Sequence, residues 1–217
     1  MFIMSGMQIA RLDTLLLASL MLLCTQPAAA QTALTVYGGY RGGGAFQQTA
    51  SPNTAVELKS SGAASLSLDW VIDANRQVQL FASRQASEMP ASSSASGSAS
   101  GTASPAVPLT MSYLHLGGTN FFEGGVGRGA YVVGGLGMTV MTPGLAGLST
   151  EVRPSMNVGL GYQLPLAASL ALRFEVRGYF TLINSNTNLF CSGGCVLSIK
   201  GDSLTQGEAM LGLAYTF

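Results

Sequence analysis

The chain has 217 residues, of which 47% are hydrophobic and only 9% are charged, and 10 basic and 10 acidic side chains leave a formal net charge of zero at pH 7. An ordinary soluble domain carries about 25% charged residues, so this composition argues against one, and the lack of a basic excess argues against a nucleic-acid partner. After the first thirty residues, no apolar run approaches the ~18 residues that a membrane-spanning helix needs.

The N-terminus has the three parts of a secretory signal peptide. Arg11 supplies a positive charge, and residues 15–24 form a short apolar segment. The three alanines at 28–30 follow Pro27 and suit a small-residue cleavage site. The apolar segment is too short to cross a bilayer as a helix. We therefore predict that residues 1–30 are a signal peptide that is removed on export.

Cleavage before Gln31 leaves residues 31–217 as the mature chain, and this length suits one domain. Met1 and Met7 both stay open as the start of translation, because the residues before Met7 add nothing that a signal peptide needs.

Beyond the predicted signal, segments of alternating apolar and polar residues recur, separated by residues typical of turns. The pattern is visible in residues 157–164 and is clearest in residues 169–182. In the second segment the apolar side chains fall on one face, and Arg173, Glu175 and Arg177 fall on the other. A period of two indicates a strand, because a helix would spread these charges around its circumference.

Eight segments carry this pattern, and single-chain bacterial barrels have an even number of strands. In lipid, every backbone N–H and C=O must be paired within the protein, so an apolar chain without spanning helices can cross only as a closed barrel. The sequence therefore predicts an all-β fold, an eight-stranded antiparallel up-and-down transmembrane β-barrel. Its strands are expected at residues 34–47, 56–71, 77–87, 108–118, 129–141, 153–164, 168–182 and 204–217.

The connections between these segments alternate in length. The long connections are residues 48–55, 88–107, 142–152 and 183–203, and the shorter ones are residues 72–76, 119–128 and 165–167. Outer-membrane barrels have long extracellular loops and short periplasmic turns, so both termini are expected in the periplasm. Within the second long connection, residues 91–104 consist of Ser, Ala, Gly and Thr, a low-complexity composition with nothing to bury.

Six charged residues fall on inward-facing positions of the predicted strands. The interior of an eight-stranded barrel is just wide enough for side chains to fill it, and a buried charge without a partner is very costly. We therefore predict a lumen ion-pair network, centred on Arg41, Arg173, Arg177 and Glu208. Its complete membership is Arg41, Asp69, Arg173, Glu175, Arg177 and Glu208. Two roles stay open for it: a polar plug that makes the barrel rigid, or a gate over a narrow channel.

Several glycines also fall on inward-facing positions, and two interpretations of them stay open. They free space in the lumen for a partial cavity, or they allow strong twist and close backbone packing. These glycines are Gly39, Gly43, Gly135, Gly137, Gly159, Gly161 and Gly212.

Cys191 and Cys195 are the only two cysteines after the predicted signal peptide. In an oxidising compartment this favours a disulfide that closes a short segment of the fourth long connection. Their spacing is not the C-x-x-C of redox sites, and no further ligand for a metal lies nearby in the sequence.

The last segment ends in Phe217 and carries apolar residues at alternate positions before it, among them Leu213 and Tyr215. It resembles the C-terminal strand shared by outer-membrane proteins, and the mature chain as a whole resembles the OmpA-type and OmpW-like small barrels. The resemblance implies a location in the bacterial outer membrane, contact with its lipid and lipopolysaccharide, and recognition of the last strand by the barrel-assembly machinery. We expect no peptidoglycan-binding domain after Phe217.

Some small barrels are enzymes that act on lipids, but the residues here do not favour catalysis. Hydrolysis needs a nucleophile and a base within reach of each other. The only histidine is His115, and lipid-A deacylases carry a serine two residues after their histidine, where this chain has Gly117. We expect no catalytic residue, no metal and no cofactor.

The sequence leaves two functions open. The first is a structural or passive small-solute permeation role, which the OmpW-like resemblance implies and the inward glycines favour. The second is a surface interaction or adhesion role through the long loops at residues 88–107 and 183–203, with an unidentified extracellular ligand. The low-complexity segment and the two cysteines favour this second role.

Overall fold

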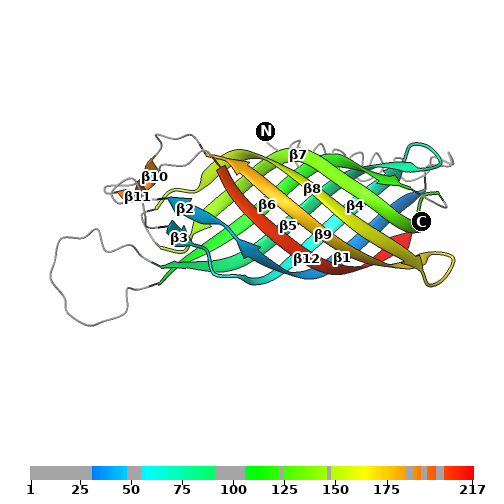
Figure 1. Ribbon diagram of the computed structural model, residues 1–217, viewed down its shortest axis with the longest axis horizontal. Helices are drawn as coiled ribbons and strands as arrows, with labels where there is room; N and C mark the ends of the chain where they lie inside the picture. The colour runs from blue at the N-terminus through cyan, green and yellow to red at the C-terminus, as the bar shows by residue number, and fades with distance from the viewer. Residues whose placement is uncertain are drawn as a thin grey trace, which may run out of the picture. The chain divides into compact units, whose positions relative to one another are not determined.

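The structure is a computed structural model that describes residues 31–47, 55–90, 106–122, 125–145, 148–183, 188–191, 195–198 and 203–217. Eight long strands form a closed antiparallel barrel in the order β1-β12-β9-β8-β7-β6-β5-β4, so the predicted fold class is confirmed (Figure 1). These strands are β1 (Thr32–Gly43), β4 (Ser61–Val71), β5 (Arg76–Pro90), β6 (Ala106–Phe121), β7 (Gly129–Pro143), β8 (Glu151–Pro165), β9 (Leu170–Leu182) and β12 (Ser203–Thr216).

A bend at two glycines ends the first barrel strand earlier than predicted. Gly43 and Gly44 have φ angles of 81° and 95°, a left-handed conformation that glycine adopts at little cost. After the bend, β2 (Ala45–Gln47) pairs with β3 (Ala55–Glu57) as a separate two-stranded ribbon. The predicted strands at residues 34–47 and 56–71 are therefore both divided between the barrel and this ribbon.

Four other barrel strands, β5 to β8, extend further than predicted, and β5 and β6 extend furthest. β5 and β6 keep their antiparallel register out to the pair Pro90 and Ala106, because a ladder continues as long as each strand offers the other its backbone groups. The fourth long connection also contains a hairpin of β10 (Asn188–Cys191) and β11 (Cys195–Ser198).

Within the described ranges, every regular element is a strand. None of the described residues belongs to a helix with the length and apolar character needed to cross a membrane.

The two ends of the barrel differ in their connections. The C-terminus and the turns β4–β5, β6–β7 and β8–β9 lie at one end, here called the short-turn end, and β2, β3, β10 and β11 lie at the other, the loop end (Figure 1). Backbone hydrogen bonds between Thr32 and Phe217 join the start of β1 to the residue after β12 at the short-turn end. The connections at the loop end are longer, as predicted, with one exception: residues 144–150 between β7 and β8 are no longer than residues 122–128 between β6 and β7.

Asp73 organises the first short turn. Its carboxylate accepts hydrogen bonds from the backbone N–H groups of Asn75 (3.0 Å) and Arg76 (2.9 Å), and from the Arg76 Nε–H (2.7 Å). The Asn75 hydrogen bond, with help from Arg76, lowers the pKa of the Asp73 carboxyl. The charged form that these bonds favour holds β4 and β5 in register at their short-turn ends.

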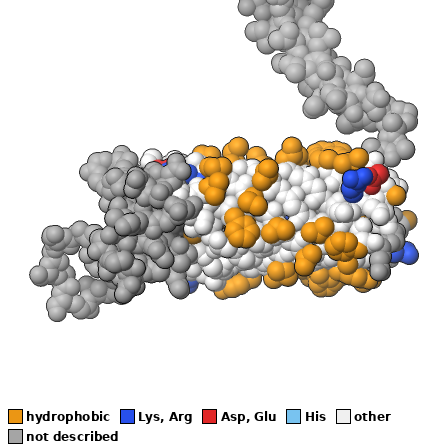
Figure 2. Space-filling view, turned by 45° about the horizontal axis from the view of Figure 1, so that its top comes forward, with side chains coloured by type: hydrophobic (Ala, Val, Ile, Leu, Met, Phe, Trp, Pro, Cys, Tyr) orange, Lys and Arg blue, Asp and Glu red, His pale blue; other side chains and the backbone are white. Residues whose placement is uncertain are grey.

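The two faces of β9 differ sharply in composition. Along β9, Arg173 and Glu175 are 0% and 2% exposed, whereas Phe174 and Val176 are 51% and 64% exposed. Apolar side chains are accordingly scattered over the outer wall of the barrel (Figure 2). This is the arrangement expected of a sheet whose outer face meets lipid and whose inner face fills a lumen.

Several of the inward glycines lie where neighbouring groups come too close for a side chain. A Cβ atom at Gly161 would collide with the Tyr131 ring, one at Gly212 with the Tyr37 ring, and one at Gly137 with the Leu114 carbonyl. At these three positions, the glycine allows close packing and does not free space in the lumen.

Replacing Gly161 with alanine therefore tests the packing of the interior. Gly161→Ala is expected to destabilise the folded barrel by about 1–3 kcal/mol, because the Tyr131 ring would have to move. The matched control is Gly38→Ala, since a Cβ at this outward position meets nothing within 4 Å, and its effect is expected to stay within about 0.5 kcal/mol. Urea unfolding of the refolded protein measures both, and equal losses in the two variants would contradict this packing.

Candidate functional site in the barrel interior

The interior of the barrel holds three ion pairs, one after another along its length. The pair nearest the short-turn end joins Arg173 of β9 to Asp69 of β4, with 2.9 Å between Nη1 and Oδ2 and neither side chain exposed. Arg173 also donates to Gln163 (2.7 Å) and Gln77 (3.3 Å). Its guanidinium group thus lies between strands on different sides of the barrel.

The carboxylate of this first pair is equally well satisfied. Asp69 accepts hydrogen bonds from Gln79 Nε2 and from the Ser67 hydroxyl, both at 2.8 Å. A buried ion pair is tolerated only when the remaining hydrogen-bonding positions of both groups are filled. The amide side chains of the interior serve this purpose here.

The second pair lies on one strand. Arg177 Nη2 and Glu175 Oε1 are 2.5 Å apart, and neither side chain is exposed. Glu175 accepts a further hydrogen bond from the Tyr131 hydroxyl at 2.8 Å, and Arg177 donates to Gln79 at 3.0 Å. Since Gln79 also donates to Asp69, this side chain links the first pair to the second.

The third pair joins the first and last strands of the barrel. Arg41 Nη2 lies 2.6 Å from Glu208 Oε2, with both side chains unexposed, and the two residues are direct register partners across β1 and β12. Arg41 also donates to the Ser83 hydroxyl, and the Tyr179 hydroxyl donates to Glu208 at 2.6 Å.

Aromatic rings pack against the three guanidinium groups, and the sequence analysis missed them. The Arg177 guanidinium carbon lies 3.7 Å from the centre of the Phe81 ring, and that of Arg41 lies 4.6 Å from the centre of the Tyr179 ring. Such contacts stabilise a desolvated cation by up to ~2 kcal/mol. The sequence does carry one signal for them, because these aromatic residues occupy inward-facing positions in the alternating pattern of their strands.

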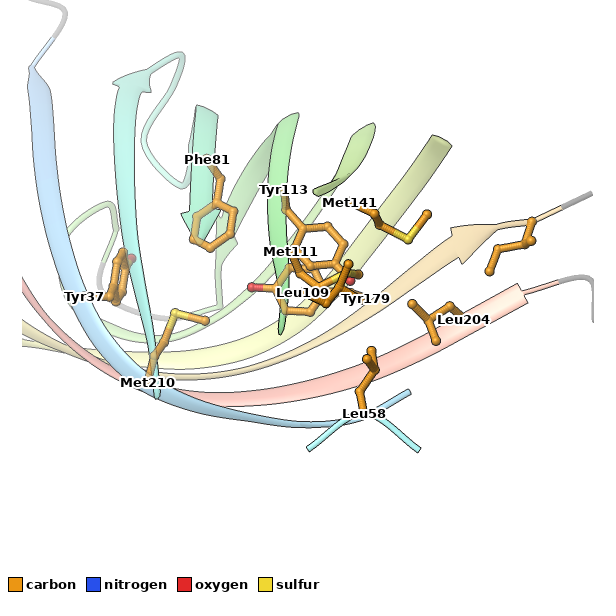
Figure 3. Close-up of a cluster of buried hydrophobic side chains, with 11 residues drawn as sticks. Tyr37, Leu58, Phe81, Leu109, Met111, Tyr113, Met141, Tyr179, Leu204 and Met210 are labelled. Atoms are coloured by element: carbon orange, nitrogen blue, oxygen red, sulfur yellow. The ribbon is translucent and has the colours of Figure 1, made fainter. Parts of the chain in front are cut away.

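An apolar layer at the loop end was also missed. Its members are buried, and they lie near the strand ends that face the long connections. They form one continuous cluster with the aromatic rings Tyr37, Phe81, Tyr113 and Tyr179 (Figure 3). The layer consists of Leu58, Leu109, Met111, Met141, Ile183 and Leu204. The interior thus changes from charged to apolar toward the loop end.

At the short-turn end the interior opens into a cavity of about 320 Å³. Four of the residues that line it are Gln31, Gln77, Arg128 and Gln163. Gln77 and Gln163 also accept hydrogen bonds from Arg173, so they separate the cavity from the first ion pair.

The six predicted lumen residues thus lie together in the interior, but not in the predicted combination. Glu208 pairs with Arg41 alone, whereas Arg173 and Arg177 pair with Asp69 and Glu175. All six side chains are buried, with exposures of 0–2%.

His115 lies beside a serine that the sequence analysis did not consider. Its Nε2 is 2.9 Å from the Ser155 hydroxyl, and the two residues are 1% and 6% exposed. Among the described residues, no partner reaches His115 Nδ1, so the third group that orients a catalytic histidine is missing from this pair. Within the same part of the chain, no three potential metal ligands come together.

The remaining predicted residues lie outside the interior or outside the described side chains. Leu213, Tyr215 and Phe217 point outward and are 52%, 54% and 67% exposed. Cys191 and Cys195 face each other in the register of the β10–β11 hairpin, but their side chains lie outside the described residues, so the disulfide stays a prediction. So does the signal peptide, since residues 1–30 are not described.

No protein-family model matches the chain, and no curated protein matches it either. Among solved structures, Neisserial surface protein A has a TM-score of 0.50 at 11% identity, over 86% of this chain and 97% of its own. OprG, an outer membrane protein from Pseudomonas aeruginosa, has a TM-score of 0.46 at 13% identity, over 87% and 97%.

The attachment invasion locus protein Ail of Yersinia pestis, solved with the heparin analogue sucrose octasulfate, has a TM-score of 0.45 at 12% identity, over 86% of this chain and 99% of its own. At such identities a likeness shows the fold alone. The likeness to Neisserial surface protein A confirms the predicted fold, a closed eight-stranded antiparallel barrel.

Removing one member of the third ion pair tests how much the pairing matters. Glu208→Gln is expected to destabilise the barrel by about 3–5 kcal/mol, because Arg41 would stay buried without a counter-charge. Replacing both, as Arg41→Met with Glu208→Met, is expected to recover much of that loss. Unfolding in urea gives the two values, and a double variant no more stable than the single one would show that the charges do not act as a pair.

Proposed function

We propose that the protein is a structural barrel of the bacterial outer membrane, closed to the passive flow of solutes, with both termini in the periplasm. The fold and the apolar outer wall support the membrane location. The gathering of the longer connections at one end supports the orientation, since long loops face the outside in barrels of this kind.

The single observation that carries the closed state is the dryness of the interior. An open pore would leave the side chains along its path accessible to water. Here Arg41, Arg173 and Arg177 are 0%, 0% and 1% exposed, and they lie on successive levels of the barrel. Of the two roles that the sequence left open for the network, this favours the plug over the gate.

Passive permeation would require these pairs to separate. Separating the charges of a buried pair leaves each without its partner and is therefore unfavourable. The shared contacts of Gln79 also tie the first two pairs to each other. The cavity at the short-turn end admits water as far as Gln77 and Gln163. Beyond them, a solute would have to displace Arg173 from Asp69.

The proposed location implies two partners. Outer-membrane lipid, including lipopolysaccharide, would surround the wall, and the barrel-assembly machinery would recognise β12. This strand offers Leu213, Tyr215 and Phe217 on its outer face and closes the barrel between β1 and β9. A role as an adhesin acting through residues 88–107 and 183–203 stays the alternative, since much of both segments lies outside the described residues.

Conductance across a planar lipid bilayer tests the closed state. The refolded chain of residues 31–217 is expected to insert without producing current steps, because paired side chains fill its interior. A semi-native gel of the same sample, with a faster unboiled band, controls for folding. Stable steps from a sample that passes this control would contradict the proposal and favour a permeation role.

A further inference from the structure

The outer wall of the barrel is not uniform. Over β8 its outward positions carry large apolar side chains such as Val158, Leu160 and Tyr162. On β4 and β5, several outward positions toward the loop end are small, among them Ala64 and Ala82. The wall is hollowed at this point into an outward-opening groove of about 430 Å³.

The groove is apolar along most of its length and carries one charge. Val36, Leu66 and Leu114 line it together with the two alanines, Ala64 and Ala82. Arg84 of β5 also lines it, points outward and is exposed. Its register partners are Ala64 on β4 and Ser112 on β6, so neither neighbouring strand places an acid beside it.

Arg84 lacks a counter-charge in the described part of the chain. None of the described ion pairs includes it, and the nearest outward acid on its strand, Glu88, is 3.0 Å from Lys59. It follows the outward apolar positions Val78, Leu80 and Ala82 on the way to the loop end. An arginine on a lipid-facing wall is unfavourable by up to ~2–4 kcal/mol, least near the interface, so an anionic partner would relieve that cost.

We propose that this groove binds lipopolysaccharide, with an acyl chain of its lipid A along the alanines and a lipid A phosphate on Arg84. This proposal rests on the proposed function, because only the stated orientation puts the loop end in the outer leaflet. A guanidinium group binds phosphate through paired charge-assisted hydrogen bonds. The small side chains at Ala64 and Ala82 leave room for a hydrocarbon chain beside it.

A second copy of the chain fits the groove less well. A symmetric dimer through this face would bring the same patch of both copies together. Two Arg84 side chains would then approach each other without a described acid to separate them. The charge therefore favours an anionic lipid over self-association.

Native mass spectrometry of the refolded chain in detergent, with added diphosphoryl lipid A, tests the groove. Arg84→Gln is expected to reduce the lipid A adduct about tenfold, the effect of losing one strong charged hydrogen-bonding contact. The double variant Ala64→Leu with Ala82→Leu keeps the charge but fills the groove, and it should reduce the adduct as well. The matched control is Arg128→Gln, which removes an exposed arginine at the opposite end.

The outcomes separate this inference from the proposed function. Lipid A adducts that fall in both groove variants and persist in Arg128→Gln would support the groove. Adducts that are equal in all variants, or equal for lipid A and phosphatidylethanolamine, would overturn it while the barrel stands. Dimers that disappear in the groove variants would instead identify a second copy as the occupant. A wild-type chain without a heat-modifiable band would overturn the outer-membrane barrel itself.

Discussion

Six ionised side chains lie inside this barrel with almost no contact with water, and each must find its partner there because burying a lone charge is so unfavourable. The three pairs draw on β1, β4, β9 and β12, and their amide and hydroxyl partners come from β5, β7 and β8 as well. The same contacts that satisfy the charges therefore connect most of the wall across the lumen. In the proposed function, these same contacts both make the barrel rigid and close it to solutes.

The outer wall differs from the interior, since side chains that face lipid are apolar. Large apolar side chains cover much of it, and the exception on β4 and β5 combines small residues with the unpaired Arg84. Inside, every arginine of the three central pairs has an acid, whereas this outward arginine has none in the described part of the chain. The proposed lipid partner would supply a negative charge from the membrane, whereas the acids that pair with the interior arginines come from the chain itself.

Much of this architecture could be predicted from the sequence, because a period of two assigns each residue to a face. The inward placement of Arg173, Glu175 and Arg177 follows from that period alone. The pairing does not, because it depends on the register: Glu208 faces both Arg41 and Arg177 across its two neighbouring strands, yet it pairs with only the first. The apolar layer was missed for another reason, since residues 108–118 carry apolar side chains on both faces and alternation cannot rank them. The bend at Gly43 and Gly44 gives no signal in a pattern of alternating residues.

Exchange of the arginine Nε protons with water, followed by NMR on the refolded barrel labelled with nitrogen-15, shows whether the interior is dry. We expect slowly exchanging signals from Arg41, Arg173 and Arg177, whose guanidinium groups are paired and buried, and fast exchange from the exposed Arg84 and Arg128. Fast exchange at all of these arginines would show a lumen filled with water, and the closed interior on which the proposed function rests would be contradicted.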